Sequence, residues 1–338
     1  MSQPSSTTMR QNTDVQHTSA TTTARSQHPA VLSLVGHTPL LRLDRIAPDL
    51  SKSVEVYAKA EWYNPGSSVK DRPTLAMILD GERTGHLRPD MRIADATSGN
   101  TGIACATLGA ALGYGVTLAM PAKASPERKR TLEVLGADLI LTDPQEGMDR
   151  DIATISALVE PHPDRFFYPD QYNNPANVQA HFDTTGAEIW SQTAGRITHF
   201  VAALGTCGPF VGTGRRLRDA NQHMQLIGVQ TDGPYHALKG VKHVATTNLV
   251  PGIYDATLAD DTIEVSSEAA FDMARRLART EGLLIGISAA ANVVAALRLA
   301  QTLERGVVVT ILCDSASKYL SETFWTDVDE ACMSGAGI

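Results

Sequence analysis

The chain has 338 residues, of which 43% are hydrophobic, and its 29 basic and 37 acidic side chains give a net charge of −8. At about 150 residues per domain, this length predicts two domains with a large buried core. The negative balance argues against a nucleic-acid-binding protein, which needs a basic face. The four cysteines lie far apart and form no C-x-x-C pair, which excludes a disulfide framework and a structural zinc site. Free thiols fit a reducing compartment, and we expect a cytoplasmic protein.

The uncharged run between Asp95 and Lys123 has the length of a membrane span, which needs about 20 mainly apolar residues. Glycines interrupt this run throughout, and its start at Thr97–Thr101 is polar. A buried helix followed by a buried strand explains the run better, so we expect no membrane segment. The ten histidines show no metal-binding spacing, and we expect no metal site.

Residues 1–29 are rich in Ser and Thr and lack apolar periodicity, which predicts a disordered tail. From residue 30 onward, strand and helix patterns alternate. Apolar strands are predicted over Val54–Ala60, Val116–Met120, Leu139–Leu141, Phe200–Ala203, Leu226–Gln230 and Val307–Leu312. Helices are predicted over Asp71–Gly85, Thr101–Leu112, Pro126–Gly136, Ser267–Glu281 and Ala289–Leu303. Apolar strands separated by helices are typical of parallel sheets covered on both faces, so we expect an α/β fold.

Such sheets bind ligands at the loops that leave the carboxyl ends of their strands and face helix N-termini. Three segments have the polar, glycine-rich composition expected there, namely Asn64–Pro73, Thr97–Gly102 and Gly205–Gly214. None carries a nucleotide-binding signature, since the third lacks G-x-G-x-x-G and no G-x-x-x-x-G-K-[ST] occurs in the chain. A dehydrogenase or a kinase is therefore disfavoured.

Seven segments occur in the order of one known family, between about Leu34 and Trp325. They are V-G-H-T-P-L (35–40), N-P-G-S-S-V-K-D-R (64–72), T-S-G-N-T-G (97–102), Q-Y-N-N-P-A-N (171–177), T-T-G-A-E-I-W (184–190), E-G-L-L-I-G-I-S (281–288) and D-S-A-S-K-Y-L-S (314–321). With them the chain resembles the cysteine synthase and cystathionine β-synthase branch of the fold type II pyridoxal-phosphate enzymes. Its V-K-D-R-P and F-V-G-T-G-R runs are most similar to the cysteine synthase B-type subgroup.

The resemblance implies a homodimer of two-domain subunits, each domain built on a twisted, mostly parallel sheet flanked by helices. It places a smaller N-terminal domain at residues 64–174. Residues 30–63 and 175–328 would form the larger domain, which carries the loop for the cofactor phosphate.

By the resemblance, Lys70 is the catalytic residue and bonds the aldehyde of pyridoxal 5′-phosphate. Its amine must lose a proton to do so, and a partly desolvated lysine near helix dipoles is suited to that. Propensity alone would make Lys70 a surface lysine paired with Asp71 or Glu61. The surrounding N-P-G-S-S-V-K-D-R segment favours catalysis instead.

The second segment, at a predicted helix start, is predicted to bind the substrate carboxylate. Free N–H groups and short hydroxyls make an anion site there, and four polar residues exceed what an ordinary helix cap needs. The resemblance assigns Thr97, Ser98, Asn100 and Thr101 to the carboxylate and also places Asn100 against the cofactor 3′-oxygen. Gln171 resembles the family's second carboxylate contact.

Backbone N–H groups at a third helix start would hold the cofactor phosphate, and the residues implied are Gly205, Thr206, Cys207, Gly208 and Pro209. The family usually has G-T-G-G-T or G-T-S-G-T here. Proline lacks both an N–H and a hydroxyl, so cofactor affinity falls unless Thr206 or Thr213 compensates. We interpret Cys207 as a small packing residue rather than a nucleophile.

Two further segments bear on the cofactor ring. The resemblance places Gly286 beside the cofactor and Ser315 against the pyridine nitrogen, with Asp314 as the alternative to Ser315. A neutral hydroxyl there leaves the nitrogen largely unprotonated, which favours β-elimination over transamination. Ala290 replaces a family glycine and puts the shape of the site in question.

The function implied is β-replacement on an activated L-serine, O-acetylserine or O-phosphoserine, to give L-cysteine. The sulfur donor would be sulfide or a thiocarboxylate carrier protein. One alternative is another nucleophile, giving 2,3-diaminopropionate or cystathionine. The other is a catalytically degenerate member acting as a binding or regulatory protein, for which Pro209 and Ala290 argue. A yellow protein with a covalently held cofactor would indicate an enzyme, and a colourless protein would indicate a degenerate member.

Overall fold

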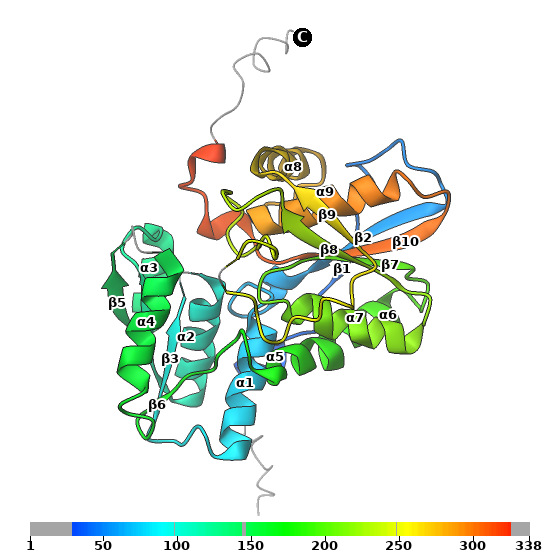
Figure 1. Ribbon diagram of the computed structural model, residues 1–338. Coiled ribbons are helices and arrows are strands. Elements are labelled where there is room, and N and C mark those ends of the chain that lie inside the picture. Colours follow the sequence, from blue (N-terminus) through cyan, green and yellow to red (C-terminus); the bar gives the residue numbers. More distant parts are fainter. Residues whose placement is uncertain (1–28, 98, 144–146, 248, 326–338) are drawn as a thin grey trace, which may run out of the picture.

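The computed structural model describes residues 29–325 except 98, 144–146 and 248, and forms two sheets, each flanked by helices (Figure 1). The predicted tail lies outside the described residues except for residue 29. No helix in the described part is long and apolar enough to cross a membrane. The described residues also hold no group of three or more His, Cys, Asp or Glu side chains that could bind a metal ion.

The smaller sheet is entirely parallel, with the strand order β5–β4–β3–β6. Its strands are β3 (Arg92–Ala96), β4 (Gly115–Pro121), β5 (Asp138–Thr142) and β6 (Phe166–Phe167). Adjacent residues of β3 face opposite sides: Ile93 joins the apolar cluster beneath α1 (Asp71–Thr84) and α2 (Asn100–Leu112). Ala94 joins the cluster beneath α4 (Gly147–Val159). Helix α3 (Pro126–Val134) leads into β5. Both faces are therefore covered, as uniformly apolar strands predict.

The larger sheet has the strand order β1–β2–β10–β7–β8–β9, and only β1 runs antiparallel to its neighbour. Its strands are β1 (Leu40–Arg42), β2 (Val54–Ala60), β7 (His199–Ala203), β8 (Gln225–Thr231), β9 (Asp261–Val265) and β10 (Gly306–Leu312). One face packs on α8 (Ser267–Thr280) and α9 (Ile287–Ala300). The other packs on α6 (Ala187–Gln192) and α7 (Gly208–Ala220), with α5 (Pro175–Ala180) and the π-helical turn η3 (His181–Gly186) beside them.

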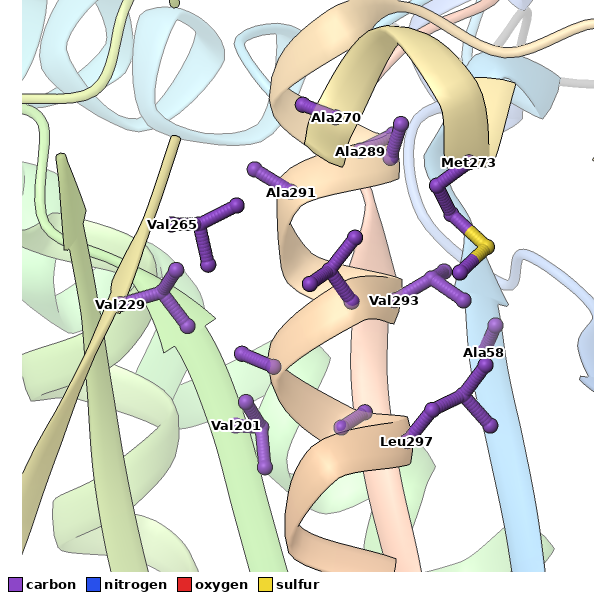
Figure 2. Close-up of a cluster of buried hydrophobic side chains, with 14 of the residues drawn as sticks. Ala58, Val201, Val229, Val265, Ala270, Met273, Ala289, Ala291, Val293 and Leu297 are labelled. Atoms are coloured by element: carbon purple, nitrogen blue, oxygen red, sulfur yellow. The ribbon is translucent and has the colours of Figure 1, made fainter. Parts of the chain in front are cut away.

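Helix α9 lies in the centre of the first face, between the sheet and α8 (Figure 2). Its alanines keep it close to the strands, while Val293 and Leu297 fill the space toward β2 and α8. A helix that is apolar all round belongs in a core. The sequence predicts this helix over 289–303, yet it starts at Ile287, which places Ser288 in its first turn.

Each sheet lies inside one of the predicted domains. The smaller sheet spans 92–167, within 64–174, and every strand of the larger sheet lies within 30–63 or 175–328. The domain boundaries themselves remain predictions. The 3-10 turns η1 (Ala30–Leu34), η2 (Glu61–Tyr63), η4 (Ala316–Lys318) and η5 (Thr323–Trp325) complete the described elements.

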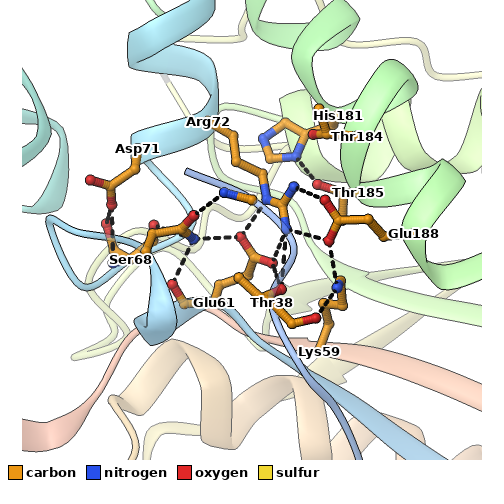
Figure 3. Close-up of polar contacts among 12 residues, drawn as sticks. Thr38, Lys59, Glu61, Ser68, Asp71, Arg72, His181, Thr184, Thr185 and Glu188 are labelled. Atoms are coloured by element: carbon orange, nitrogen blue, oxygen red, sulfur yellow. Dashed lines mark hydrogen bonds and ion pairs between the residues drawn. The ribbon is translucent and has the colours of Figure 1, made fainter. Parts of the chain in front are cut away.

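A buried ionic network joins the start of α1 to the larger sheet (Figure 3). Arg72 binds the carboxylate of Glu61 with its Nε at 2.7 Å and that of Glu188 with its Nη1 at 2.6 Å. Lys59 is fully buried in β2 and lies 2.6 Å from Glu188. Thr38 donates its hydroxyl to Glu61 at 2.7 Å. Every charge in this network has an opposite partner, as buried charges require.

Candidate active site

A cavity of about 280 Å³ lies between the two sheets and adjoins a deeper one of about 80 Å³. The first turns of four helices meet there, since the lining includes Lys70 at the start of α1, Asn100 in α2, Pro209 in α7 and Ser288 in α9. Helix N-termini carry unpaired N–H groups and partial positive charge. Their convergence makes the cavity suited to an anionic ligand.

Lys70 lines both cavities and immediately precedes α1. Its Nζ donates a hydrogen bond to Thr206 Oγ1 at 3.1 Å. Burial lowers the pKa of the amine from its usual value, which favours the neutral nucleophile. The Lys70 side chain is therefore buried at the start of α1 and faces both cavities.

The loop before Lys70 is held by the buried side chain of Asp71. Its carboxylate accepts hydrogen bonds from the N–H of Gly66 at 2.7 Å and of Ser68 at 3.2 Å. A Cβ on Gly66 would lie 2.3 Å from Asp71 Oδ1, so only glycine fits there. Burial raises the pKa of Asp71 to about 6, against the opposing effect of these bonds. Asp71 thus fixes the loop rather than pairing with Lys70.

The predicted carboxylate loop faces the wider cavity. Thr97, Asn100, Thr101 and Gln171 all line it, while Ser98 lies outside the described residues. Thr101 donates its hydroxyl to Gln171 Oε1 at 2.9 Å, so the two residues are neighbours although 70 positions apart. The structure therefore brings together the four described residues of this predicted set.

The predicted phosphate loop follows β7 and leads into α7. Gly205, Thr206 and Pro209 line the deeper cavity. Cys207 is buried and has a φ of +69°, a conformation that favours glycine, and it packs in the apolar cluster beneath α7. Burial raises the pKa of its thiol to about 12, which supports its interpretation as a packing residue. A Cβ on Gly208 would lie 1.9 Å from Asn177 Oδ1, so this position requires glycine.

Of the two hydroxyls considered as substitutes for the missing ligand at Pro209, only Thr206 lines the cavity. Thr213 is fully buried in α7, and no hydrogen-bond partner for its Oγ1 is found among the described residues. Pro209 occupies the first turn of α7, where proline interrupts no helical hydrogen bond. The loop therefore keeps its helix but has one N–H fewer to offer an anion.

We expect Pro209→Thr to tighten cofactor binding, because it restores an N–H and a hydroxyl at the phosphate loop. The upper scale is about 1.5–3 kcal/mol per charge-assisted hydrogen bond. The measurement is the dissociation constant of the cofactor for both proteins, followed by their rates under saturating cofactor. Weaker binding by the threonine variant would show that proline shapes this loop.

The structure does not bring Ser315 to the cavity. Its Oγ lies 2.7 Å from Ser317 Oγ, and its backbone pairs with Ile285. Ser288 lines the deeper cavity instead, beside Cys313. Helix α9 begins earlier than the sequence predicts. This start places Ser288 in the first turn of the helix, where it lines the cavity.

Three other positions considered for the site, Asp314, Gly286 and Ala290, do not line either cavity. Asp314, the alternative to Ser315, is fully buried and does not line either cavity. Gly286 also lies outside the lining, and a Cβ there would meet Asp314 Oδ1 at 2.0 Å. Ala290 packs in the apolar cluster around α9, so it leaves the shape of the cavity unaffected.

We expect Ser288→Asp to slow β-replacement and increase transamination, because a carboxylate in the deeper cavity would favour a protonated ring nitrogen. Ser315→Asp is the matched control and should change neither. Product analysis and NMR of the ring nitrogen give the answer. A larger effect at residue 315 than at residue 288 would restore the prediction from the sequence.

Sequence reasoning missed several lining residues. Asn292 and Cys313 line the deeper cavity, Arg128, Tyr172 and Lys242 line the wider one, and Lys239 and Tyr319 line both. Most of these residues lie outside the family-like segments, so the sequence offered no reason to select them. Tyr172 and Tyr319 lie within such segments. A cavity of about 590 Å³ between α1 and α5 is mainly apolar and contains none of the predicted site residues.

The residues around the cavity fit pyridoxal phosphate. A desolvated lysine amine can bond an aldehyde, and helix N-termini with Thr206 can bind a phosphate. Asn292 Oδ1 and Thr213 Oγ1 are buried without hydrogen-bond partners in the described residues. Such groups, in an α/β fold, are those expected of an enzyme that binds a cofactor with an aldehyde and a phosphate.

Comparison with known proteins identifies the family. The family model "Pyridoxal-phosphate dependent enzyme" matches residues 31–314, and the chain belongs to this family. The chain is 48% identical to cysteine synthase of Aquifex aeolicus over 310 residues, which cover 90% of this chain and 94% of that protein. It is 40% identical to cysteine synthase B of Escherichia coli, over 90% and 98% of the two chains.

A solved structure gives the same result for the fold. Cysteine synthase from Entamoeba histolytica superimposes with a TM-score of 0.85 at 31% identity, covering 93% of this chain and 95% of that one. The predicted fold class, cofactor and family are therefore confirmed. The roles of the individual site residues remain predictions.

Proposed function

We propose that this protein makes L-cysteine by replacing the β-substituent of an activated L-serine with sulfur. The observation that carries the proposal is the position of Lys70, desolvated at one end of a cavity whose other walls are an anion-binding loop and a phosphate loop. The named relatives, both cysteine synthases, support this choice of reaction.

Pyridoxal phosphate, when bound, bonds the amino group of an amino acid and stabilises negative charge at its Cα. Lys70 would hold the cofactor, and the same amine would take the Cα proton of the substrate as general base. Burial serves both roles, because it lowers the pKa of the amine and keeps water away. Thr206 accepts from this amine and so orients it.

Substrate orientation would come from the loop at the start of α2. Thr97, Asn100 and Thr101, with Gln171, offer hydroxyl and amide groups to a carboxylate. A carboxylate held there fixes the Cα within reach of Lys70, and such positioning lowers the barrier by removing wrong orientations.

The mouth of the wider cavity supplies positive charge. Arg128, Lys239 and Lys242 line it. Acetate and phosphate are both anionic leaving groups, so these side chains would favour departure of either. This is why O-phosphoserine has to be compared directly with O-acetylserine.

The decisive experiment measures product formation by the purified protein loaded with cofactor. O-acetylserine, O-phosphoserine and serine are each offered with sulfide, thiosulfate, homocysteine and ammonia. Cysteine from an activated serine and sulfide is the expected main product. Higher turnover with homocysteine or ammonia would establish a cystathionine or diaminopropionate enzyme instead, and a colourless, inactive protein would establish a degenerate family member.

We propose further that the protein is a cytoplasmic homodimer and that its sulfur arrives as sulfide or on a thiocarboxylate carrier protein. The family resemblance supports the dimer. Light scattering of the purified protein tests it, and a mass of one chain would contradict it.

A further inference from the structure

Lys318 is a buried lysine that lies outside the cavity but touches its wall. It ends the turn η4, close to the C-terminal end of the described chain, and is 9% exposed. Its ammonium donates hydrogen bonds to the carbonyls of Gly66 at 3.1 Å and Ser67 at 3.0 Å, and to Asn100 Oδ1 at 2.7 Å. All three donors of this ammonium are used. Lys318 therefore connects the loop that carries Lys70 to the first residue of α2.

Asp314 holds the other side of the same amide. Its Oδ2 accepts from Asn100 Nδ2 at 2.7 Å and from the Tyr319 hydroxyl at 2.5 Å. The carboxylate is fully buried, and the absence of a Cβ at Gly286 leaves room for its second oxygen. The Asn100 amide is thus enclosed between a buried cation and a buried anion.

These partners allow only one orientation of the amide. An ammonium can only donate, so it must face the carbonyl oxygen, and a carboxylate must face the NH₂ group. A flipped amide would set donor against donor at Lys318 and acceptor against acceptor at Asp314. Two buried charged groups would then lose hydrogen bonds, which is costly in a low dielectric.

We propose that Lys318 and Asp314 are positioning residues that fix the Asn100 amide and set its place relative to Lys70. The inference rests on the proposed function, in which Asn100 contacts cofactor and substrate. Neither residue touches the substrate, because neither lines the cavities. They act through Asn100, which lines both.

The experiment is a double-mutant cycle in the cofactor-loaded protein. Its members are Lys318→Met, Asn100→Ala and the double variant, with Lys318→Arg as the conservative change. The readouts are KM and kcat for O-acetylserine, the absorption spectrum of the bound cofactor and its dissociation constant, and thermal unfolding. Lys59→Met is the matched control, since Lys59 is also a buried lysine with three partners and lies outside the cavities.

We expect Lys318→Met to raise KM about 10- to 100-fold, the scale of a misplaced positioning group, and to shift the cofactor spectrum. In the Asn100→Ala background the same change should raise KM much less, because the amide through which Lys318 acts is gone and only its bonds to the loop before Lys70 remain to be lost. Lys318→Arg should recover part of the loss, since guanidinium also donates to several acceptors. Lys59→Met should lower stability and leave KM and the spectrum unchanged.

Additive effects of Lys318→Met and Asn100→Ala would overturn the inference. So would a Lys318→Met variant that loses stability as Lys59→Met does but keeps its KM and spectrum. If Lys318→Met does not fold, Asp314→Asn takes its place in the cycle with the same two criteria. A wild-type protein that binds no cofactor would instead contradict the proposed function itself.

Discussion

Replacing Lys70 with alanine is expected to abolish turnover and covalent retention of the cofactor while the fold persists. The side chain makes a single hydrogen bond, to Thr206, so its removal costs little structure. Two other lysines are poor substitutes: Lys239 lines both cavities but its ammonium is paired with Glu322 at 2.6 Å, and Lys242 lines the wider cavity but not the deeper one. The loss in rate should exceed about 10³-fold, since both the covalent anchor and the general base disappear.

The measurement combines steady-state rates with borohydride reduction and mass spectrometry of the washed protein. Lys129→Ala is the control, because Lys129 is a partly exposed lysine outside both cavities whose ammonium donates to the carbonyl of Ala122. It should keep full activity and full reduction. Cofactor still fixed to the Lys70→Ala protein by borohydride would show that another residue holds it.

Arg72→Met is expected to cause the largest loss of stability. Arg72 binds both carboxylate oxygens of Glu61 and both of Glu188, and Glu61 is fully buried. Removing the guanidinium leaves a buried carboxylate without its cation, which costs about 3–5 kcal/mol. The free energy of unfolding, from denaturant titration followed by tryptophan fluorescence, measures this loss.

Arg196→Met is the matched control, since Arg196 also binds a carboxylate, that of Glu55, through two nitrogens but at the surface. Solvent screens such a pair, so the control should lose much less stability. Equal losses in the two variants would show that burial does not decide the strength of the network. The dependence of stability on pH provides a second check of this network.

In the folded protein, hydrogen bonds and ion pairs with Arg72 and Lys59 outweigh burial and lower the pKa of Glu188 to about 2. In the unfolded chain the pKa of this carboxyl is 4.5, so its lower pKa in the folded protein stabilises the fold at pH values above 4.5. This contribution disappears as the pH falls from 4.5 toward 2. The wild-type protein should therefore lose stability between pH 4.5 and 2. Arg72→Met should lose less over that interval, because the main partner of Glu188 is already gone.

The sequence by itself determined the class of fold, and it predicted which loops carry the site. Alternating apolar strands and helices predicted parallel sheets, because only a strand buried on both faces can be apolar throughout. The N-P-G-S-S-V-K-D-R segment pointed to Lys70, and the polar start of α2 to the carboxylate loop. The assignment of Lys70 rests on the family resemblance, whereas the carboxylate loop also rests on local chemistry, because a polar helix start offers N–H groups and hydroxyls to an anion.

Only the tertiary structure decided which distant side chains share the cavity. Ser288 and Ser315 both lie in family-like segments, but Ser288 lines the cavity from the first turn of α9, whereas the hydroxyl of Ser315 bonds to Ser317. The partners of Asn100 lie more than 200 positions away, in a turn whose composition gave no hint of them. The sequence does not show in which direction the hydroxyl or ammonium group of a side chain points. Its direction follows from packing between elements, and that is fixed when the two sheets and their helices come together.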